Sequence, residues 1–116
     1  IIGLPGEDAE ESIRQASIIS SLPINILKIH QMQIIRGTLL AKEYMEQPFH
    51  LYTVDEYLNV ICEYVKRLRK DLVLERFVSQ SPEGLLIAPK WGLKNYEFTN
   101  LLVRKMIDEN IKQGEA

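Results

Sequence analysis

Residues 24–35 constrain the fold of this chain more than any other segment, because apolar side chains stand on both of their alternating faces. A strand that is apolar on both faces is typical of a parallel sheet with helices on both sides. The segment follows a Gly-Pro turn over residues 3–6 and a helix-like stretch that begins near Ala9. The pattern therefore predicts a right-handed strand, helix, strand unit in which residues 1–4 supply the first strand.

The first helix is expected to begin at Asp8, because Glu11 follows three residues later at the spacing of a capping box. Pro23 is expected to end this helix, since the residue before a proline is pushed out of the α region. Apolar residues at helical spacing predict one buried face. These residues are Ala9, Ile13, Ala16 and Ile19.

Residues 53–70 predict an amphipathic helix, with a T-x-x-E capping box at Thr53 and Glu56 and basic residues at its C-terminal end. The last helix is expected over residues 95–112, stopped by Gly114. Its predicted buried residues are Phe98, Leu101, Leu102 and Met106. The remaining expected elements are a short helix over 39–45, a strand over 72–78 and an extended piece over 85–89.

The composition indicates one soluble globular domain and disfavours several classes of partner. Of the 116 residues, 46% are hydrophobic, and a net charge of -2 with interspersed charges gives no footprint for a nucleic acid or a membrane. The longest apolar runs fall far short of the roughly 20 residues that a membrane-spanning helix needs. A single cysteine, Cys62, excludes an internal disulfide, indicates a reducing, cytoplasmic setting, and is expected to be a buried inert thiol.

Ligands of parallel α/β units bind at the carboxyl ends of the strands, which fall here at residues 3–7 and 31–38. Glycines in the first turn would let a ligand approach the backbone, although Pro5 has no N–H, and a purely structural turn stays an alternative. No metal-ligand spacing such as C-x-x-C occurs, so no metal site built from this chain is expected.

Four other residues have both a functional and a structural interpretation. His30 could face a cleft or hydrogen-bond within the core. Arg76 stands in an apolar strand, where a buried guanidinium would need either a carboxylate such as Glu75 or an anionic ligand. Trp91 and Lys94 lie on an irregular segment where functional residues gather, though a tryptophan there commonly anchors the loop.

The order of motifs resembles the C-terminal part of radical S-adenosylmethionine (radical SAM) proteins, in particular the YhcC-like group labelled Fe-S oxidoreductases. The motifs are "IIGLPGE", "ILKIHQMQIIRGTLLA", "YTVDEYLNVICEYVKRL" and "LLIAPKW", which together span nearly the whole chain. The resemblance implies an α/β fold, the C-terminal part of a partial β/α (TIM-like) barrel with two to three parallel strands, flanking helices and a C-terminal helical extension. Residues 1–50 would belong to the barrel and residues 51–116 to the extension.

In this family a [4Fe-4S] cluster held by C-x-x-x-C-x-x-C cleaves S-adenosylmethionine to a 5′-deoxyadenosyl radical. With one cysteine the chain is expected to bind no cluster, to hold no catalytic residue and to be inactive as an isolated fragment, whereas its parent would be an enzyme. The resemblance assigns the adenine of S-adenosylmethionine to Ile1, Gly3 and the backbone near Gln31 and Met32. Substrate-side roles are implied for His30, Arg76, Trp91 and Lys94.

The resemblance also implies partners. The missing N-terminal half of the barrel is the expected partner of the first strand, and a fragment with bare strand edges is expected to self-associate. A non-enzymatic α/β interaction module is the main alternative. A phosphate-binding half barrel is disfavoured by the acidic residues Asp8, Glu10 and Glu11 at the start of the first helix.

Overall fold

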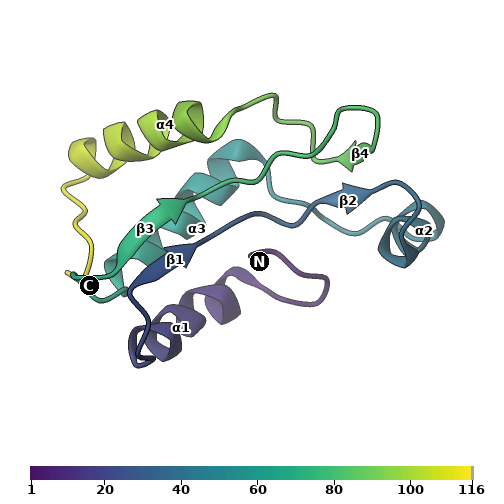
Figure 1. The fold of residues 1–116 in the computed structure, drawn as a ribbon. Helices are drawn as coiled ribbons and strands as arrows, with labels where there is room; N and C mark the ends of the chain where they lie inside the picture. The colour runs from purple at the N-terminus through teal and green to yellow at the C-terminus, as the bar shows by residue number, and fades with distance from the viewer. Residues whose placement is uncertain (116) are drawn as a thin grey trace.

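The computed structural model describes residues 1–115, and short strands alternate with helices along them (Figure 1). The elements in chain order are α1 (Ala9–Ser20), β1 (Ile26–Lys28), β2 (Ile34–Ile35), α2 (Leu39–Glu46), α3 (Val54–Lys66), β3 (Val73–Arg76), β4 (Leu86–Ala88) and α4 (Asn95–Asp108).

The predicted strand, helix, strand unit is present. Ile2 forms a parallel bridge with Gln31: its N–H donates to the His30 carbonyl at 3.0 Å, and its carbonyl accepts from the Met32 N–H at 3.0 Å. On its other edge β1 pairs in parallel with β3. Three neighbouring parallel segments therefore end at the same side of the molecule, which confirms the α/β architecture expected from the sequence.

The single strand expected over residues 24–35 is interrupted. β1 stops at Lys28, and the two-residue β2 pairs antiparallel with β4 in a separate small sheet. Between them the side-chain amide of Gln31 takes the place of a backbone ladder, because it accepts from the Ser79 N–H at 3.0 Å and donates to the Ser79 carbonyl at 3.1 Å. Alternating apolar residues predicted the extended backbone but could not reveal that side chains continue the pairing.

The helices begin where the sequence predicts. The Asp8 carboxylate accepts from the Glu11 N–H at 2.8 Å at the start of α1. At α3 both bonds of the capping box form, from the Glu56 N–H to Thr53 Oγ1 at 3.2 Å and from the Thr53 N–H to Glu56 Oε1 at 3.0 Å. These caps satisfy N–H groups that have no partner within the helix.

The end of α4 differs from the prediction. The helix stops at Asp108 instead of Lys112, because Asn110 adopts a left-handed conformation with φ of 54° that cannot continue a helix. Phe98 and Leu102 are buried as predicted and Met106 is half-buried, but Leu101 is 38% exposed. Leu101 points to the side of the buried stripe, so its assignment to the core was wrong.

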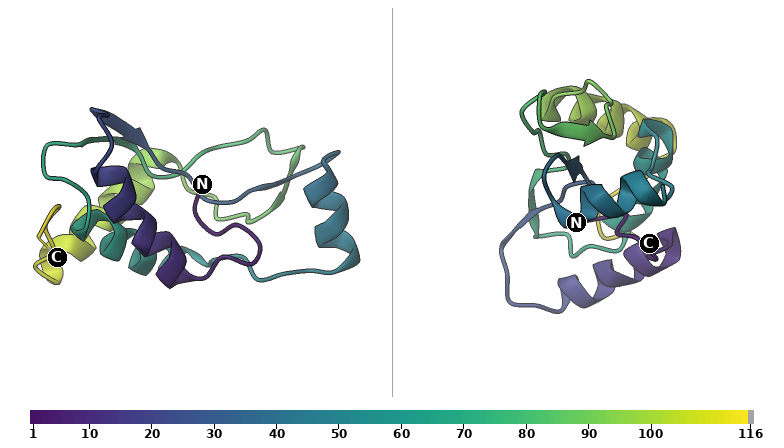
Figure 2. Two further views of the ribbon diagram at one scale, coloured as in Figure 1. Left: turned by 90° about the horizontal axis from the view of Figure 1, so that it is seen from below. Right: turned by 90° about the vertical axis from the view of Figure 1, so that its right-hand side faces the viewer.

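The main core lies between the strands and the helices α1, α3 and α4, with α1 and α3 on one face of the β1/β3 pair (Figures 1 and 2). Tyr57 and Tyr64 are core aromatics, and burial raises the pKa of Tyr64 to about 12. The opposite face of the pair is bare: Ile26 and Val73 are in register and each is 57% exposed. The expected cover on both faces is therefore present on one face only within residues 1–115.

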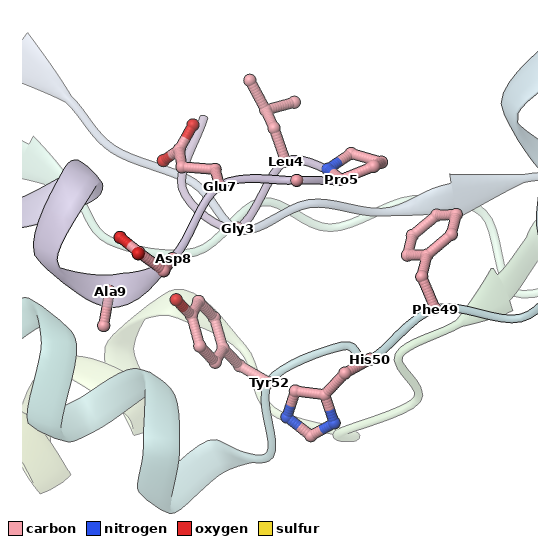
Figure 3. A pocket seen from close by; sticks show the side chains of 10 residues that line it. Gly3, Leu4, Pro5, Glu7, Asp8, Ala9, Phe49, His50 and Tyr52 are labelled. Atoms are coloured by element: carbon pink, nitrogen blue, oxygen red, sulfur yellow. The ribbon is translucent and has the colours of Figure 1, made fainter.

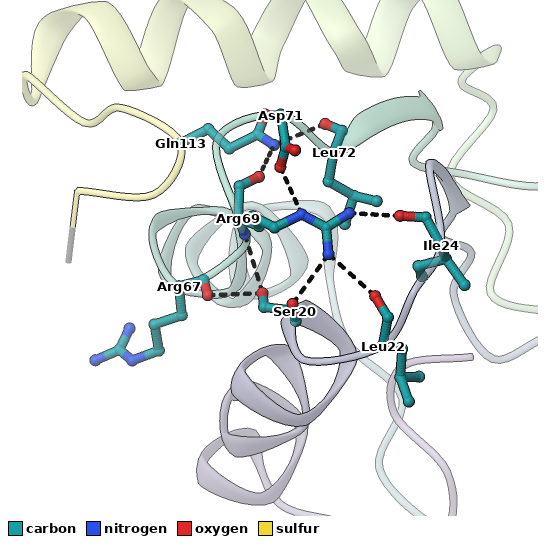
Figure 4. A network of polar contacts seen from close by, with 8 residues as sticks. All are labelled: Ser20, Leu22, Ile24, Arg67, Arg69, Asp71, Leu72 and Gln113. Atoms are coloured by element: carbon teal, nitrogen blue, oxygen red, sulfur yellow. Dashed lines mark hydrogen bonds and ion pairs between the residues drawn. The ribbon is translucent and has the colours of Figure 1, made fainter.

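Arg69 joins three segments just beyond α3 (Figure 4). Its guanidinium donates to the carbonyls of Ser20 and Leu22, each at 3.0 Å, and to that of Ile24. The C-terminal tail joins the same network, since the Gln113 amide donates to the carbonyls of Arg69 and Leu72 at 2.8 Å each. The sequence suggested only a favourable position near the helix dipole for this arginine, whereas the structure makes it the link from α3 to the connection between α1 and β1.

Candidate functional site

A small void of about 10 Å³ lies where the carboxyl ends of the first two parallel segments meet residues 51–52 and 89–91. This is roughly the space of one water molecule. Its lining comprises Ile2, Gly3, Gln31, Met32, Leu51, Tyr52, Pro89 and Trp91. The structure thus brings together three residues that the resemblance assigns to the adenine, together with Trp91 from the predicted substrate side. The fourth, Ile1, is 57% exposed beside them.

Gly3 is the one position of this turn where the backbone and the packing both demand glycine. Its φ is +96°, and a Cβ there would lie 3.1 Å from Cε2 of the Tyr52 ring. The turn therefore rests directly on Tyr52, a residue that the sequence did not single out. Burial, followed by the charge of Glu7, raises the pKa of the Tyr52 hydroxyl. In the sequence, only the glycine at position 3 indicated that another side chain could pack closely against this turn.

A cavity of about 290 Å³ opens on the outer side of the same turn, between residues 3–9 and the segment of Phe49, His50 and Tyr52 (Figure 3). Its carboxylates already have partners: Glu7 accepts from the buried Ser12 hydroxyl and Asp8 caps α1. The His50 ring instead faces Glu56, with 3.0 Å between Nε2 and Oε2.

A larger cavity of about 400 Å³ lies between the carboxyl end of β1 and the loop before α4. Trp91 and Lys94 stand on its wall with Gln31 and Gln33. Trp91 is also an anchor, as the structural interpretation expected, because its indole N–H donates to the Tyr52 carbonyl at 3.1 Å. Its ring centre lies 5.1 Å from that of Tyr57, so the loop is fastened to the core while it lines the cavity.

The polar groups of Gln31 and Met32 are largely committed to the fold. The Gln31 side chain is 6% exposed and brackets Ser79, while Gln33 accepts from the Ser81 hydroxyl at 2.8 Å. The Met32 N–H donates to Ile2. A ligand at this strand end would therefore meet main-chain carbonyls in preference to free amides.

Of the remaining predicted substrate-side residues, Arg76 stands differently from expectation and His30 does not. Arg76 is exposed and makes no ion pair with any residue in the range 1–115, so the idea of a buried guanidinium was wrong. A shift in register places it opposite Lys28, whose Nζ lies 4.0 Å from Glu75. His30 is half-buried, and its Nδ1 lies 3.4 Å from the Gln31 carbonyl.

The residues present do not fit an iron–sulfur cluster. Within the described part of the chain no three His, Cys, Asp or Glu side chains are grouped so that they could hold a metal ion. Cys62 is 2% exposed in the core, and burial raises the pKa of its thiol, which confirms the inert interpretation. No helix over residues 1–115 has the length and apolar character needed to cross a membrane.

Comparison with known families decides the identity. Residues 24–108 match the family model of the radical SAM C-terminal domain. The chain belongs to this family. An uncharacterised protein of Methanocaldococcus jannaschii is 27% identical over 98% of this chain, and YtqA of Bacillus subtilis is 24% identical over 99% of it. YhcC of Escherichia coli, the group named by the resemblance, is 22% identical over 100% of the chain.

The chain covers only part of these relatives, 36% of the first two and 37% of YhcC. Among solved structures, archaeal Elp3 from Methanocaldococcus infernus superposes with a TM-score of 0.81 at 20% identity, over 97% of this chain and 26% of that protein. This likeness confirms the expected fold, part of a β/α barrel of the radical SAM type.

Proposed function

We propose that this chain forms the C-terminal side of the barrel of a radical SAM Fe-S oxidoreductase and contributes part of its S-adenosylmethionine site. The observation that supports the proposal most is the parallel bridge between Ile2 and Gln31, directly beside the Gly3 turn. It stands at the carboxyl ends of the strands, where barrel enzymes bind their ligands. A cluster with S-adenosylmethionine would supply the radical, and its cysteine ligands would come from outside these 116 residues.

The assigned residues have distinct roles in this proposal. Ile1 packs on the adenine ring, and Gly3 lets the turn approach it. The Met32 N–H is occupied by Ile2, so the main-chain carbonyls of Gln31 and Met32 are left to accept from the adenine amino group. On the substrate side, Trp91 and Lys94 would line the binding cavity. His30 and Arg76 would face the substrate from the strand ends.

The bare face of the β1/β3 pair supports a partner of the same protein. Ile26 and Val73 present apolar surface there, and Ile2 is the last paired residue at its edge of the strands described. We expect the preceding barrel strands to cover this surface. Without them the isolated chain would be inactive and would associate through its strand edges.

Anaerobic reconstitution with iron and sulfide tests the proposal. Two chains are compared, the 116-residue chain and one extended at its N-terminus to the length of the curated relatives. We expect the charge-transfer absorption of a [4Fe-4S] cluster in the longer chain only. Stoichiometric absorption in the 116-residue chain, or none in the longer chain, would contradict the proposal.

Binding of S-adenosylmethionine to the reconstituted longer chain tests the adenine site. Ile1→Ala should weaken binding by roughly tenfold, the effect of about 1.4 kcal/mol of lost apolar contact. Ile18→Ala is the matched control, because Ile18 is 60% exposed on α1, away from the strand ends. Equal affinities of the two variants, measured by calorimetry, would remove Ile1 from the site.

A further inference from the structure

The outer side of α4 carries an apolar stripe that residues 1–115 leave uncovered. Tyr96, Val103 and Ile107 are 63%, 48% and 73% exposed, and Asn100 is exposed between them. Their spacing of four, three and four residues places all four on one face of the helix. This face is opposite to buried Phe98, so α4 has an apolar stripe on both sides and uses only one of them in the core.

Charged residues flank the outer stripe on one side only. Glu97 and Arg104 are seven residues apart and therefore lie on the same flank. Arg104 is exposed and has no ion pair among the residues that the structure describes. Glu97 uses Oε1 to accept from the Lys94 N–H at 3.0 Å, and its second oxygen has no recorded partner within residues 1–115.

We propose that α4 is a self-association helix through which two copies of this chain pack antiparallel about a two-fold axis. In that arrangement Tyr96 of each copy lies opposite Ile107 of the other, and Val103 lies opposite Asn100. The occupant is a second copy because the stripe and its charges are self-complementary.

The charges select the antiparallel orientation. Antiparallel helices bring like flanks together, so Arg104 of each copy faces Glu97 of the other, displaced by about 3 Å along the axis, two residues of helical rise. An arginine side chain spans that offset. A parallel pair would instead bring the opposite flanks together and set Arg104 against Thr99, which gives no charge pairing. One helix per copy is a small interface, so the dimer is weak and populated only at high concentration.

A charge-swap experiment on the 116-residue chain tests the proposal. Sedimentation equilibrium at protein concentrations up to about 1 mM should show a monomer–dimer equilibrium. A dissociation constant of about 1 mM corresponds to about 4.1 kcal/mol of binding free energy. Arg104→Glu and Glu97→Lys should each weaken self-association at least about tenfold, because each sets like charges face to face twice. An equimolar mixture of the two variants restores both ion pairs and should dimerise again.

Two controls separate this interface from association through the strands. Val103→Glu should abolish association through α4, seen as loss of the contacts between Tyr96 and Ile107, whereas Val73→Glu on the bare sheet face should leave those contacts unchanged. Because Glu97 also caps α4, circular dichroism must show unaltered helix content in Glu97→Lys; Arg104→Glu leaves that cap intact and gives an independent result. In a sample mixed from differently labelled copies, nuclear Overhauser contacts should join Tyr96 to Ile107.

Three results would overturn the inference. These are a monomer at every concentration, contacts between Tyr96 and Ile107 that survive Val103→Glu, and a mixture of charge variants that fails to restore those contacts. None of them affects the cluster reconstitution, so the self-association helix and the radical SAM proposal can fail separately.

Discussion

Two neighbouring cross-strand pairs of the same sheet differ in their surroundings. Leu27 and Leu74 are in register and pack on the core formed by α1 and α3. Ile26 and Val73, one residue earlier on each strand, are also in register, yet each is 57% exposed. The difference shows that one face of the β1/β3 pair is complete within residues 1–115 and that the other, where Ile26 and Val73 stand beside the exposed Lys28–Glu75 pair, is not. Apolar residues on both faces of a strand therefore identify surfaces that are suited to burial, whether or not the described chain supplies the cover.

The largest expected loss of stability comes from removing a side chain from the core behind the covered face. Phe98 is 0% exposed and its ring centre lies 5.3 Å from that of Tyr57, so Phe98→Ala should lower the free energy of unfolding by about 3–5 kcal/mol. Val73→Ala on the bare face should change it by less than about 0.5 kcal/mol. Urea denaturation of both variants checks this contrast. Similar losses in both would mean that the bare face is already covered in solution.

The next effect concerns the link between α3 and the start of β1. Arg69→Ala removes donors from three main-chain carbonyls and should lower the free energy of unfolding by about 2 kcal/mol. Arg67→Ala is the control, since that guanidinium makes an exposed pair with Glu63 and should cost under about 0.5 kcal/mol. Equal stability of the two variants would show that the Arg69 hydrogen bonds do not stabilise the contact between α3 and the connection from α1 to β1.

The Gly3 turn offers a test at the edge of the sheet. Gly3→Ala places a Cβ on a residue with positive φ and brings it against the Tyr52 ring. It should lower the free energy of unfolding by about 1–2 kcal/mol. Gly84→Ala is the matched control, because an added Cβ there meets nothing within 4 Å. Thermal unfolding of both variants measures the difference. Equal melting temperatures would show that the turn relaxes away from the ring.

The smallest expected effect is a pH dependence at the start of α3. The Thr53 N–H, followed by the His50 ring, holds the pKa of the Glu56 carboxyl below its usual 4.5. A lowered pKa in the folded state gives stability that is present above the unfolded value and is lost as the pH falls through the folded value. Loss of the cap should appear as a shift of the Thr53 amide resonance in an acid titration. Glu56→Gln should abolish that titration.

The sequence predicted the elements whose signals are local. The Asp8 cap of α1, the capping box of α3 and the parallel strand, helix, strand unit depend on residues a few positions apart, so the pattern itself contains the information. The end of α4 was not predicted, because it depends on the left-handed conformation of Asn110. Asparagine adopts this conformation only at some positions, and the sequence pattern does not identify them. Local patterns thus predicted where elements begin better than where they stop.

The candidate site depended on contacts between distant residues and was predicted less completely. Gly3, Gln31 and Met32, which the resemblance assigns to one site, line the same void, but Tyr52 beneath the turn and the pairing of Gln31 with Ser79 depend on separations that no spacing rule covers. Arg76 was expected to be buried because its neighbours are apolar. The register shift opposite Lys28 and the lack of a cover on that face place it in solvent instead.

Gln31, whose side chain brackets Ser79, has a consequence for the opening between the carboxyl ends of β1 and β3. Where a ladder would hold two backbones about 4.8 Å apart, an interposed amide keeps them separated by the length of a side chain. The width of that opening is then fixed by covalent bonds of one residue instead of by how tightly the interior packs. Shortening Gln31 to asparagine would draw the walls inward and narrow the entrance, while leaving the hydrophobic layer behind it intact.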